Sequence, residues 1–209
     1  MVVNTKAERK FQSLFYDPNL GLAILKNNKI CPVKLFNRFW FVQRLDLYNS
    51  DISSLKGIEI FRNLKKLNIE GNNIVDITPL THLRKLKELN VYNNGIRQIT
   101  ELSNCKNLKR LNIEGNKIVD LSALAHLHKL EKLNIYDNDF RQITELSHCN
   151  KLKELYIYHP QVMDYKQLGN ITNLKILYVN HFETNEDDIR ELQSHIPHCK
   201  IETIMGYVF

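Results

Sequence analysis

Few residues in this sequence have the type and spacing that metal binding or nucleophilic catalysis requires. His195, His198 and Cys199 lie close together, and both residue types are common zinc ligands. A structural zinc site needs four ligands, and the sequence offers no fourth candidate nearby. His148 and Cys149 are adjacent, but the repeat pattern described below directs Cys149 into the core, and no orienting group is evident. We therefore predict neither a metal site nor a catalytic residue.

The short motifs of common active sites are absent as well. The sequence contains no glycine-rich phosphate loop and no GxSxG, HExxH or paired CxxC motif. We predict from this that the chain is not an enzyme, needs no cofactor and binds no small-molecule substrate.

Composition and charge are typical of a soluble, folded protein. Hydrophobic residues make up 43% and charged residues 25% of the 209 residues, and the formal net charge is +6. Lys and Arg are spread through the repeats with 23 acidic residues mixed in, which disfavours nucleic acid as the partner. No stretch approaches the roughly 18 apolar residues that a membrane span needs.

The N-terminal segment and the cysteines bear on localisation. No apolar region of about 7–15 residues follows the first basic residues, so no Sec signal is visible. Cys105 and Cys149 occupy equivalent positions two repeats apart, roughly 10 Å, which is too far for a disulfide. A reducing compartment fits this pattern. We expect a cytoplasmic protein, with non-Sec secretion into a host as the alternative.

The dominant feature of the sequence is a 22-residue repeat. Its unit is LxxLxLxxNxIxxIxxLxxL, and five apolar registers follow it through most of the chain. Residues 64–107 and 108–151 match at 28 of 44 positions, which indicates duplication of a repeat pair. The most regular register is Leu45, Leu67, Leu89, Leu111, Leu133, Leu155 and Leu177.

This unit, and the segment NNIVDITPLTHLRKL above all, resemble the leucine-rich-repeat superfamily in its 22-residue subclass. That subclass includes the bacterial internalins and the phosphatase-regulatory repeat subunits of eukaryotes. The resemblance covers roughly residues 40–181. It implies an α/β fold, namely a right-handed solenoid with a concave parallel β-sheet and a convex side of short 3₁₀ or helical pieces. A helical N-terminal cap and an α/β C-terminal cap complete the expected architecture.

The pattern within each repeat independently predicts the same architecture. The pieces RLDLY, KLNIE and ELNVY alternate apolar and polar residues with period two, as strands do. The apolar residues that follow come every three positions, which suits 3₁₀ turns. Asn72, Asn94, Asn116 and Asn138 recur where the chain leaves a strand, and we interpret them as a structural ladder that satisfies backbone groups. Ser50 and Pro160 replace the asparagine in the outer repeats.

The segments outside the repeats are expected to cover the ends of the solenoid. We assign residues 1–39 to a helical cap, residues 40–181 to about seven repeats and residues 182–209 to a C-terminal cap, all in one structural domain. In the first cap we expect a helix from Asn4 or Thr5 to about Tyr16 and a second short helix over residues 20–25. The side chains expected to face the core there are Phe11, Leu14, Phe15, Phe36, Phe39, Trp40 and Phe41.

The C-terminal cap has the signals of a helix followed by a strand. Thr184 or Asn185 can cap the helix, and acidic residues follow in its first turn. Ile189, Leu192 and Ile196 form one apolar face, and Pro197 ends the helix. The segment CKIETI is expected to add a final strand.

The outward-facing strand positions form columns on the concave face. One column carries charges of both signs, a second is mostly asparagine and is expected to be a solvated polar stripe, and a third alternates between Tyr and Glu. Tyrosine is frequent at protein interfaces, and its density rises toward the C-terminal repeats. We therefore predict a partner-binding patch of Tyr136, Tyr156, Tyr158, Tyr178, His159 and His181, with Lys132 and Glu154 fixing orientation and Tyr92 nearby. The alternative is that these tyrosines only reflect strand propensity.

The leading functional hypothesis is a non-catalytic scaffold or adaptor, expected to be a monomer, that binds a protein on its concave face. The resemblance to internalins implies a bacterial effector-like module that engages a host protein. The resemblance to phosphatase-regulatory repeats implies an intracellular regulatory subunit instead, and association with a ribonucleoprotein complex is a further alternative.

Overall fold

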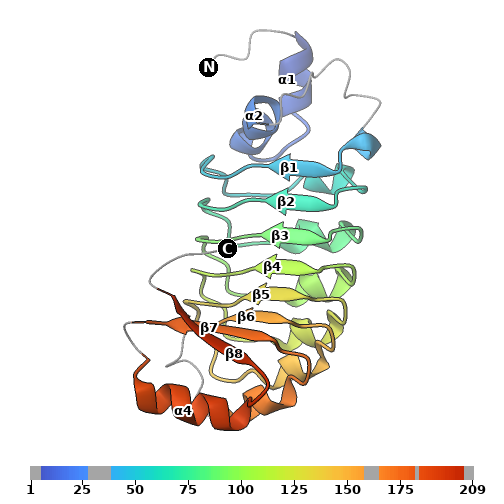
Figure 1. Cartoon of the computed structure of the whole chain (residues 1–209). Coiled ribbons are helices and arrows are strands. Elements are labelled where there is room, and N and C mark those ends of the chain that lie inside the picture. Colours follow the sequence, from blue (N-terminus) through green and yellow to red (C-terminus); the bar gives the residue numbers. More distant parts are fainter. Residues whose placement is uncertain (1–5, 28–38, 158–164, 182–183, 205–209) are drawn as a thin grey trace.

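The computed structural model describes residues 6–27, 39–157, 165–181 and 184–204 (Figure 1). Its eight strands form one parallel sheet in sequence order, as the repeat predicted. From β1 to β7, each strand residue lies opposite the residue 22 positions later, such as Leu45 opposite Leu67. The strands are β1 (Arg44–Asp46), β2 (Lys66–Asn68), β3 (Glu88–Asn90), β4 (Arg110–Asn112), β5 (Lys132–Asn134), β6 (Glu154–Tyr156), β7 (Ile176–Asn180) and β8 (Lys200–Ile204).

Short 3₁₀ helices form the other side of the solenoid. Backbone hydrogen bonds of 2.9–3.0 Å join Ile77, Leu80, Leu83 and Leu86 in steps of three. Since a 3₁₀ helix has three residues per turn, this spacing directs all four side chains into the core. The 3₁₀ helices are η1 (Phe39–Phe41), η2 (Ile58–Ile60), η3 (Thr78–His82), η4 (Thr100–Asn104), η5 (Ser122–His126), η6 (Thr144–His148) and η8 (Tyr165–Asn170).

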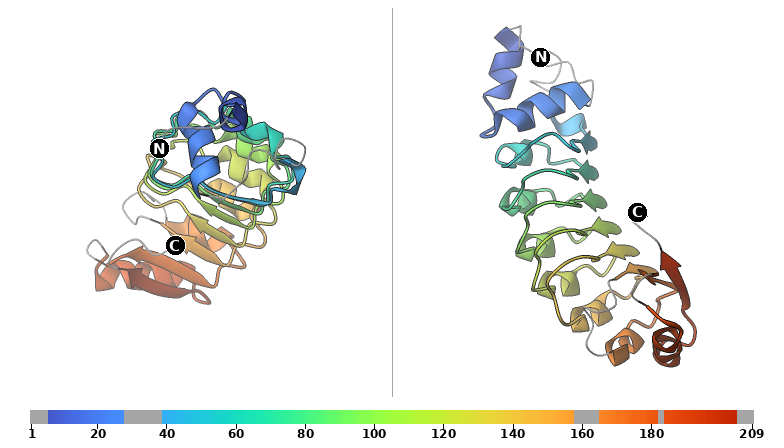
Figure 2. Two further views of the ribbon diagram at one scale, coloured as in Figure 1. Left: turned by 90° about the horizontal axis from the view of Figure 1, so that it is seen from above. Right: turned by 90° about the vertical axis from the view of Figure 1, so that its left-hand side faces the viewer.

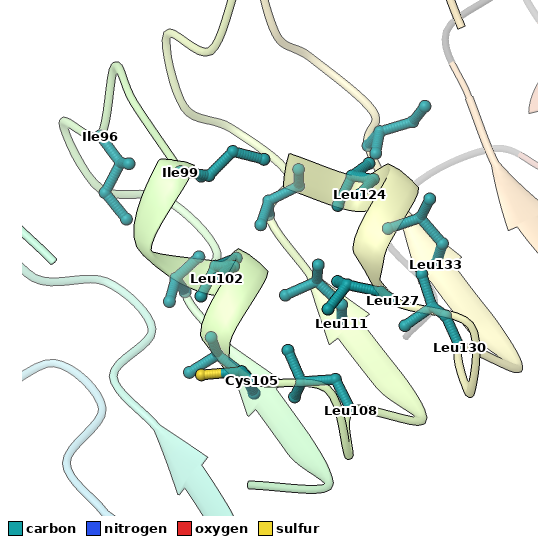
Figure 3. Close-up of a cluster of buried hydrophobic side chains, with 14 of the residues drawn as sticks. Ile96, Ile99, Leu102, Cys105, Leu108, Leu111, Leu124, Leu127, Leu130 and Leu133 are labelled. Atoms are coloured by element: carbon teal, nitrogen blue, oxygen red, sulfur yellow. The ribbon is translucent and has the colours of Figure 1, made fainter. Parts of the chain in front are cut away.

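One continuous apolar core fills the space between the sheet and the 3₁₀ helices (Figure 3). Leu111 and Leu133 enter it from the strands, and Leu102 and Leu124 enter it from η4 and η5. Cys105 is buried with them, which confirms that it packs as a small hydrophobic residue. The strands lie on the inner side of a gentle arc and the 3₁₀ helices on its outer side (Figure 2).

The asparagine ladder forms as expected at the ends of the strands. The Asn116 amide donates to the carbonyls of Val91, Ile113 and Glu114 at 2.9–3.0 Å, and its Oδ1 accepts from the Ile96 amide at 3.1 Å. Asn72, Asn94 and Asn138 donate to the equivalent carbonyls. Each side chain therefore joins two adjacent turns and satisfies backbone groups that the bend leaves unpaired.

At the same bends, the residue just before each ladder position has a left-handed backbone conformation. Asn49, Asn93 and Asp137 have φ of 46°, 50° and 50°, and Gly71 and Gly115 have φ of 64°. This left-handed backbone region is readily adopted by Gly and tolerated by Asn and Asp. The choice among these three residue types at equivalent positions thus follows from the backbone.

Two helices, α1 (Lys6–Gln12) and α2 (Pro18–Asn27), lie against the first turns of the solenoid. Phe11 and Phe15 are buried as expected, but Leu14 is 41% exposed because the helix ends at Gln12 rather than near Tyr16. The expected capping residues Asn4 and Thr5 lie outside the described residues.

Asp17 fastens this helical segment to the repeats. Its buried carboxylate accepts hydrogen bonds from the Ser53 amide at 2.6 Å and the Ser54 amide at 3.1 Å. Burial raises the pKa of Asp17, but the hydrogen bonds from Ser53, Asn19 and Ser54 outweigh it and lower the pKa below the usual value. The carboxylate is therefore charged at neutral pH.

The aromatic cluster before the first strand is only partly in the core. Phe39 packs against Phe11 and Phe61, with ring centroids 6.1 and 5.7 Å away. The expectation that Trp40 and Phe41 pack on the first repeat was wrong, since they are 59% and 56% exposed and lie on one another with centroids 4.3 Å apart. Phe36 lies outside the described residues.

The C-terminal elements match their predicted order, with α4 (Glu186–His195) followed by β8. Asn185 caps α4 and forms a capping box with Asp188. Leu192 and Ile196 are buried, and Ile189 is partly buried against the core. In Figure 2, α4 and β8 extend from the C-terminal end of the arc toward the side on which the strands lie.

Candidate functional site

The charged column of the concave face is the first outward-facing position of strands β1 to β6. Its members lie directly opposite one another in the sheet, since Lys66 pairs with Glu88 and Glu88 with Arg110. Glu88 forms an ion pair with Lys66 at 2.9 Å and a longer one with Arg110 at 3.8 Å. Lys132 pairs with Glu154 at 3.5 Å. These pairs are partly exposed, so each contributes little to stability but fixes a pattern of charge.

A groove of about 680 Å³ runs along this column. The backbone at Leu45, Leu67 and Leu89 forms its floor, because the side chains of these residues are buried in the core, and charged and polar side chains surround it. Its charged lining consists of Arg44, Lys66, Glu88, Arg110, Glu131, Lys132, Lys153 and Glu154. The groove offers charges of both signs over a surface that spans six strands.

The asparagine column is not the solvated stripe that we expected. Asn112 and Asn134 are each only 2% exposed. The side chains in this column bond to acidic neighbours one repeat away, with Asn68 donating to Asp46 at 3.0 Å and Asn90 to Glu70 at 2.9 Å. The column is therefore a hydrogen-bonded network built into the sheet surface.

Glu114 lies at the most buried part of this network. Its side chain is 3% exposed and accepts a hydrogen bond from Asn134. The pKa of Glu114 is raised to about 7, chiefly by burial; the bond from Asn134 partly offsets this, and the nearby Asp137 and Glu70 add to it. Near neutral pH, Glu114 is thus divided between its protonated and charged forms.

The structure brings together five of the predicted patch residues. Tyr156 and Tyr178 stack with centroids 4.1 Å apart, and the Lys132 ammonium lies 4.9 Å from the Tyr156 ring centroid. Glu154 pairs with Lys132, and the Tyr136 hydroxyl accepts a hydrogen bond from Asn180 at 2.6 Å. These contacts link strands β5, β6 and β7.

The same contacts bury part of the predicted binding surface, so that part is not available to a partner. Tyr156 is only 3% exposed, so the expectation of a freely exposed tyrosine there was wrong. Burial and the hydrogen bond with Tyr156 raise the pKa of Tyr178 to about 12, so this hydroxyl is neutral at ordinary pH. The stack holds the C-terminal end of the sheet together in addition to any role in binding.

The remaining predicted residues lie apart from the stack. Tyr92 is half-buried at the level of β3, beside Gly115. His181 is exposed after β7, with Nδ1 3.4 Å from the Thr203 hydroxyl. Tyr158 and His159 lie outside the described residues. The exposed Trp40 and Phe41 were missed as surface residues, although their alignment with positions 62 and 63 of the next repeat would have indicated exposure.

The side chains considered for chemistry are not arranged for it. Cys105, Cys149 and Cys199 are buried free thiols, and burial raises their pKa values to about 11, 12 and 11. Such thiols are poor nucleophiles because the reactive thiolate is scarce. Across the described ranges, no group of three or more His, Cys, Asp or Glu side chains could hold a metal ion.

The stacked repeats, the asparagine ladder and the open concave sheet define a leucine-rich-repeat protein. Residues 17–138, more than half of the chain, match the family model described as the leucine-rich-repeat domain of the endo-β-N-acetylglucosaminidase EndoS, and the chain belongs to that family. No curated protein sequence matches the chain.

Solved structures with similar folds include two internalins from Listeria monocytogenes. The chain is 25% identical to internalin inlF, with a TM-score of 0.75, over 92% of this chain and 64% of the other. It is 23% identical to internalin C2, with a TM-score of 0.73, over 93% of this chain and 90% of the other. The chain thus spans less than two thirds of the length of the first of these structures.

These likenesses confirm the leucine-rich-repeat fold and its internalin-like character. Leucine-rich-repeat domains and internalin-like folds typically serve as protein-interaction scaffolds. Within the described residues, no helix combines the length and the apolar character that crossing a membrane requires.

Proposed function

We propose that the chain is a non-catalytic protein-binding scaffold that uses the concave face of its solenoid. The observation that carries this proposal is the groove of about 680 Å³ across strands β1 to β6. Its column of Arg44, Lys66, Glu88 and Arg110 offers charges of both signs at the spacing of the strands, about 4.8 Å. A rigid surface of this kind selects a partner by complementary charge.

The mixed signs of the groove favour a protein over a uniform polyanion. A protein surface can supply both carboxylates for Lys66 and Arg110 and cationic groups for Glu88. Tyr178, stacked on the buried Tyr156 at the C-terminal end of the same face, offers an aromatic edge to a partner. The predicted patch therefore contributes to the proposed surface at its rim, through Tyr136, Tyr178 and His181.

The finer role follows the internalin likeness, which supports an adaptor of the bacterial effector type over a regulatory subunit of a phosphatase or ribonucleoprotein complex. We place this adaptor in a reducing compartment such as the cytoplasm, since the three described cysteines are free thiols. We also propose that the protein acts as a monomer, with its concave face open to the partner.

A pair of matched surface variants tests the use of the concave face. The first is Lys66→Ala/Glu88→Ala/Arg110→Ala in the groove. The control is Lys117→Ala/Asp139→Ala/Arg141→Ala. It changes exposed residues where the chain has left the strands, and it alters the net charge by the same amount as the groove variant. The measurement is quantitative mass spectrometry of proteins captured from the source cells, followed by titration of the purified partner.

The proposal predicts that the groove variant loses the partner by roughly tenfold in affinity while the control retains it. Circular dichroism establishes that both variants fold. Equal capture by the groove variant and the wild type, or a loss confined to the control, would overturn the proposal.

A further inference from the structure

The basic residues of the repeats concentrate on one edge of the solenoid. This entry edge consists of the residues just before strands β2 to β7 and the first residue of each of those strands, and it lies on the right of the sheet in Figure 1. It contains 14 of the 29 Lys and Arg residues but only three of the 23 Asp and Glu residues. Its segments are residues 62–66, 84–88, 106–110, 128–132, 150–154 and 172–176.

The opposite edge, where the chain leaves the strands, has the reverse balance. Seven Asp and Glu residues and only three Lys and Arg residues lie there. Its segments are residues 48–54, 70–76, 92–98, 114–120 and 136–142. The net charge of +6 therefore conceals a protein that is strongly basic along one edge and mildly acidic along the other.

At the centre of the entry edge, lysines stand in a backbone-bonded row. The amide of Lys87 donates to the carbonyl of Lys65 at 2.8 Å, and Lys109 donates to Lys87 at 2.8 Å. The row continues through Glu131 to Lys153 and Lys175 with bonds of 2.8–2.9 Å. We call Lys65, Lys87, Lys109, Lys153 and Lys175 the lysine ladder. Adjacent like charges at about 4.8 Å repel one another.

The carboxylates of the edge neutralise only part of this charge. Glu88, Glu131 and Glu154 pair with four cations, namely Lys66, Arg110, Lys109 and Lys132. The other ten form no ion pair with any carboxylate in the described part of the chain. They are Arg62, Lys65, Arg84, Lys85, Lys87, Lys106, Lys129, Lys151, Lys153 and Lys175. A partner that brings negative charge would relieve their mutual repulsion.

The exposed pair Trp40 and Phe41 continues this edge at its N-terminal end. The Asn63 side chain donates to the Trp40 carbonyl at 2.7 Å and accepts from the Lys85 ammonium at 2.6 Å. Asn63 therefore links the backbone of the aromatic pair to Lys85 on the same edge. An exposed tryptophan beside cations is a composition typical of binding hot spots.

We infer that the entry edge docks an extended acidic segment of a protein partner. Its carboxylates lie along the lysine ladder, and an apolar side chain packs on Trp40 and Phe41. Lys65 to Lys175 spans five strand spacings, about 24 Å, which seven or eight extended residues cover. This inference rests on the proposed scaffold function and names the partner chemistry.

Two features favour a protein over other polyanions. Glu131 interrupts the ladder, and Glu88 and Glu154 face the adjoining groove, so a uniformly charged phosphate polymer meets repulsion at three places. A duplex also has no apolar group to place on Trp40. An acidic peptide can avoid the glutamates and supply the apolar contact.

The test uses a labelled peptide of six glutamates with two glutamines at their centre, flanked on each side by two leucines. Either direction of binding then reaches the aromatic pair and leaves a neutral side chain near Glu131. Fluorescence anisotropy at low ionic strength measures its affinity. The comparison probes are the same peptide with glutamine in place of glutamate, a DNA duplex of about 20 base pairs, and vesicles of equal parts phosphatidylserine and phosphatidylcholine.

Three variants locate the site. Lys87→Glu/Lys153→Glu/Lys175→Glu reverses the charge at three positions of the lysine ladder. Arg97→Glu/Lys117→Glu/Arg141→Glu makes the same change of net charge at exposed positions of the opposite edge. Trp40→Ala/Phe41→Ala removes the aromatic pair without changing charge.

The inference predicts that the ladder variant loses roughly tenfold or more in peptide affinity, the opposite-edge variant less than about threefold, and the aromatic variant about threefold to tenfold. Equal losses in the two charge-reversal variants would overturn it. So would tighter binding of the duplex or the vesicles than of the peptide, or no binding of the peptide at all. If the groove variant Lys66→Ala/Glu88→Ala/Arg110→Ala abolishes partner capture while the ladder variant does not, the scaffold function stands and only the acidic-segment inference fails.

Discussion

Glu114 shows how one side chain couples the concave face to pH. Its folded pKa of about 7 lies above the ordinary value of 4.5, so between these pH values the folded protein holds a proton that the unfolded chain releases. The contribution of Glu114 to stability is therefore most favourable below pH 4.5, falls as pH rises toward 7 and stays unfavourable above it.

Glu114→Gln should remove this dependence. At pH 8 we expect the variant to be more stable than the wild type by up to roughly 3 kcal/mol, and at pH 4 the difference should largely vanish. Urea denaturation at the two pH values measures this. Glu70→Gln, at the equivalent position two repeats earlier, is the control and should gain much less. A variant no more stable than the wild type at pH 8 would show that Glu114 stays charged without penalty.

The asparagine ladder gives a second prediction at the residue scale. Asn116→Ala would remove one donor from each of three carbonyls and leave the Ile96 amide without its acceptor, at a cost of about 2–4 kcal/mol. Asn73→Ala, at an exposed position one residue after a ladder asparagine, should change stability by less than about 0.5 kcal/mol. Thermal or chemical denaturation compares the two. Similar losses would contradict the structural role of the ladder.

At the residue scale, the sequence predicts roles where a residue repeats in register. The asparagine ladder and the buried cysteines were predictable because a strict period of 22 places equivalent residues in equivalent surroundings. The burial of Tyr156 was not, because it depends on contacts with Tyr178 and Lys132 from neighbouring strands. Those side chains close over one another only once the sheet has formed.

Among the elements, strands β5 to β7 are joined by side chains as well as by backbone. Tyr156→Ala should therefore cost roughly 3 kcal/mol in the free energy of unfolding, close to the loss of a core aromatic residue. Tyr48→Ala, at a concave position that is 51% exposed, should cost less than about 0.5 kcal/mol. If Tyr156→Ala leaves stability unchanged, the stack is not structural and the tyrosine is held for binding.

Most elements could be placed from the sequence, since period-two and period-three apolar spacing distinguish the strands from the 3₁₀ helices. The ends of the solenoid were harder. The helix that stops at Gln12 and the exposure of Trp40 and Phe41 lie where the repeat begins, and no period constrains them. The capping box at Asn185 was predictable because its signal is local.

For the whole molecule, stacking of identical turns converts a one-dimensional sequence pattern into surfaces. A residue type repeated at one position becomes a column, which is how the charged groove and the lysine ladder arise. The columns could be listed from the sequence. The position of the groove could not, since it depends on the size and tilt of side chains across six strands.

The lysine ladder also predicts a response of the whole molecule to salt. Lys87→Glu places an acid between Lys65 and Lys109 and should stabilise the protein by about 0.5 kcal/mol at low ionic strength. The gain should shrink at high salt, because exposed charges are screened. Denaturation at two salt concentrations measures it. A gain that does not depend on salt would show that charge repulsion is not its cause.

The most direct test of the central claim, that a protein partner binds the concave face, is site-specific photocrosslinking in the source cells. Benzoylphenylalanine replaces Tyr92 on the concave face in one variant and the exposed convex residue His126 in another. We predict a discrete crosslinked protein adduct from position 92 and none from position 126. An adduct from position 126 alone would contradict the account and place the binding surface on the 3₁₀ side of the solenoid.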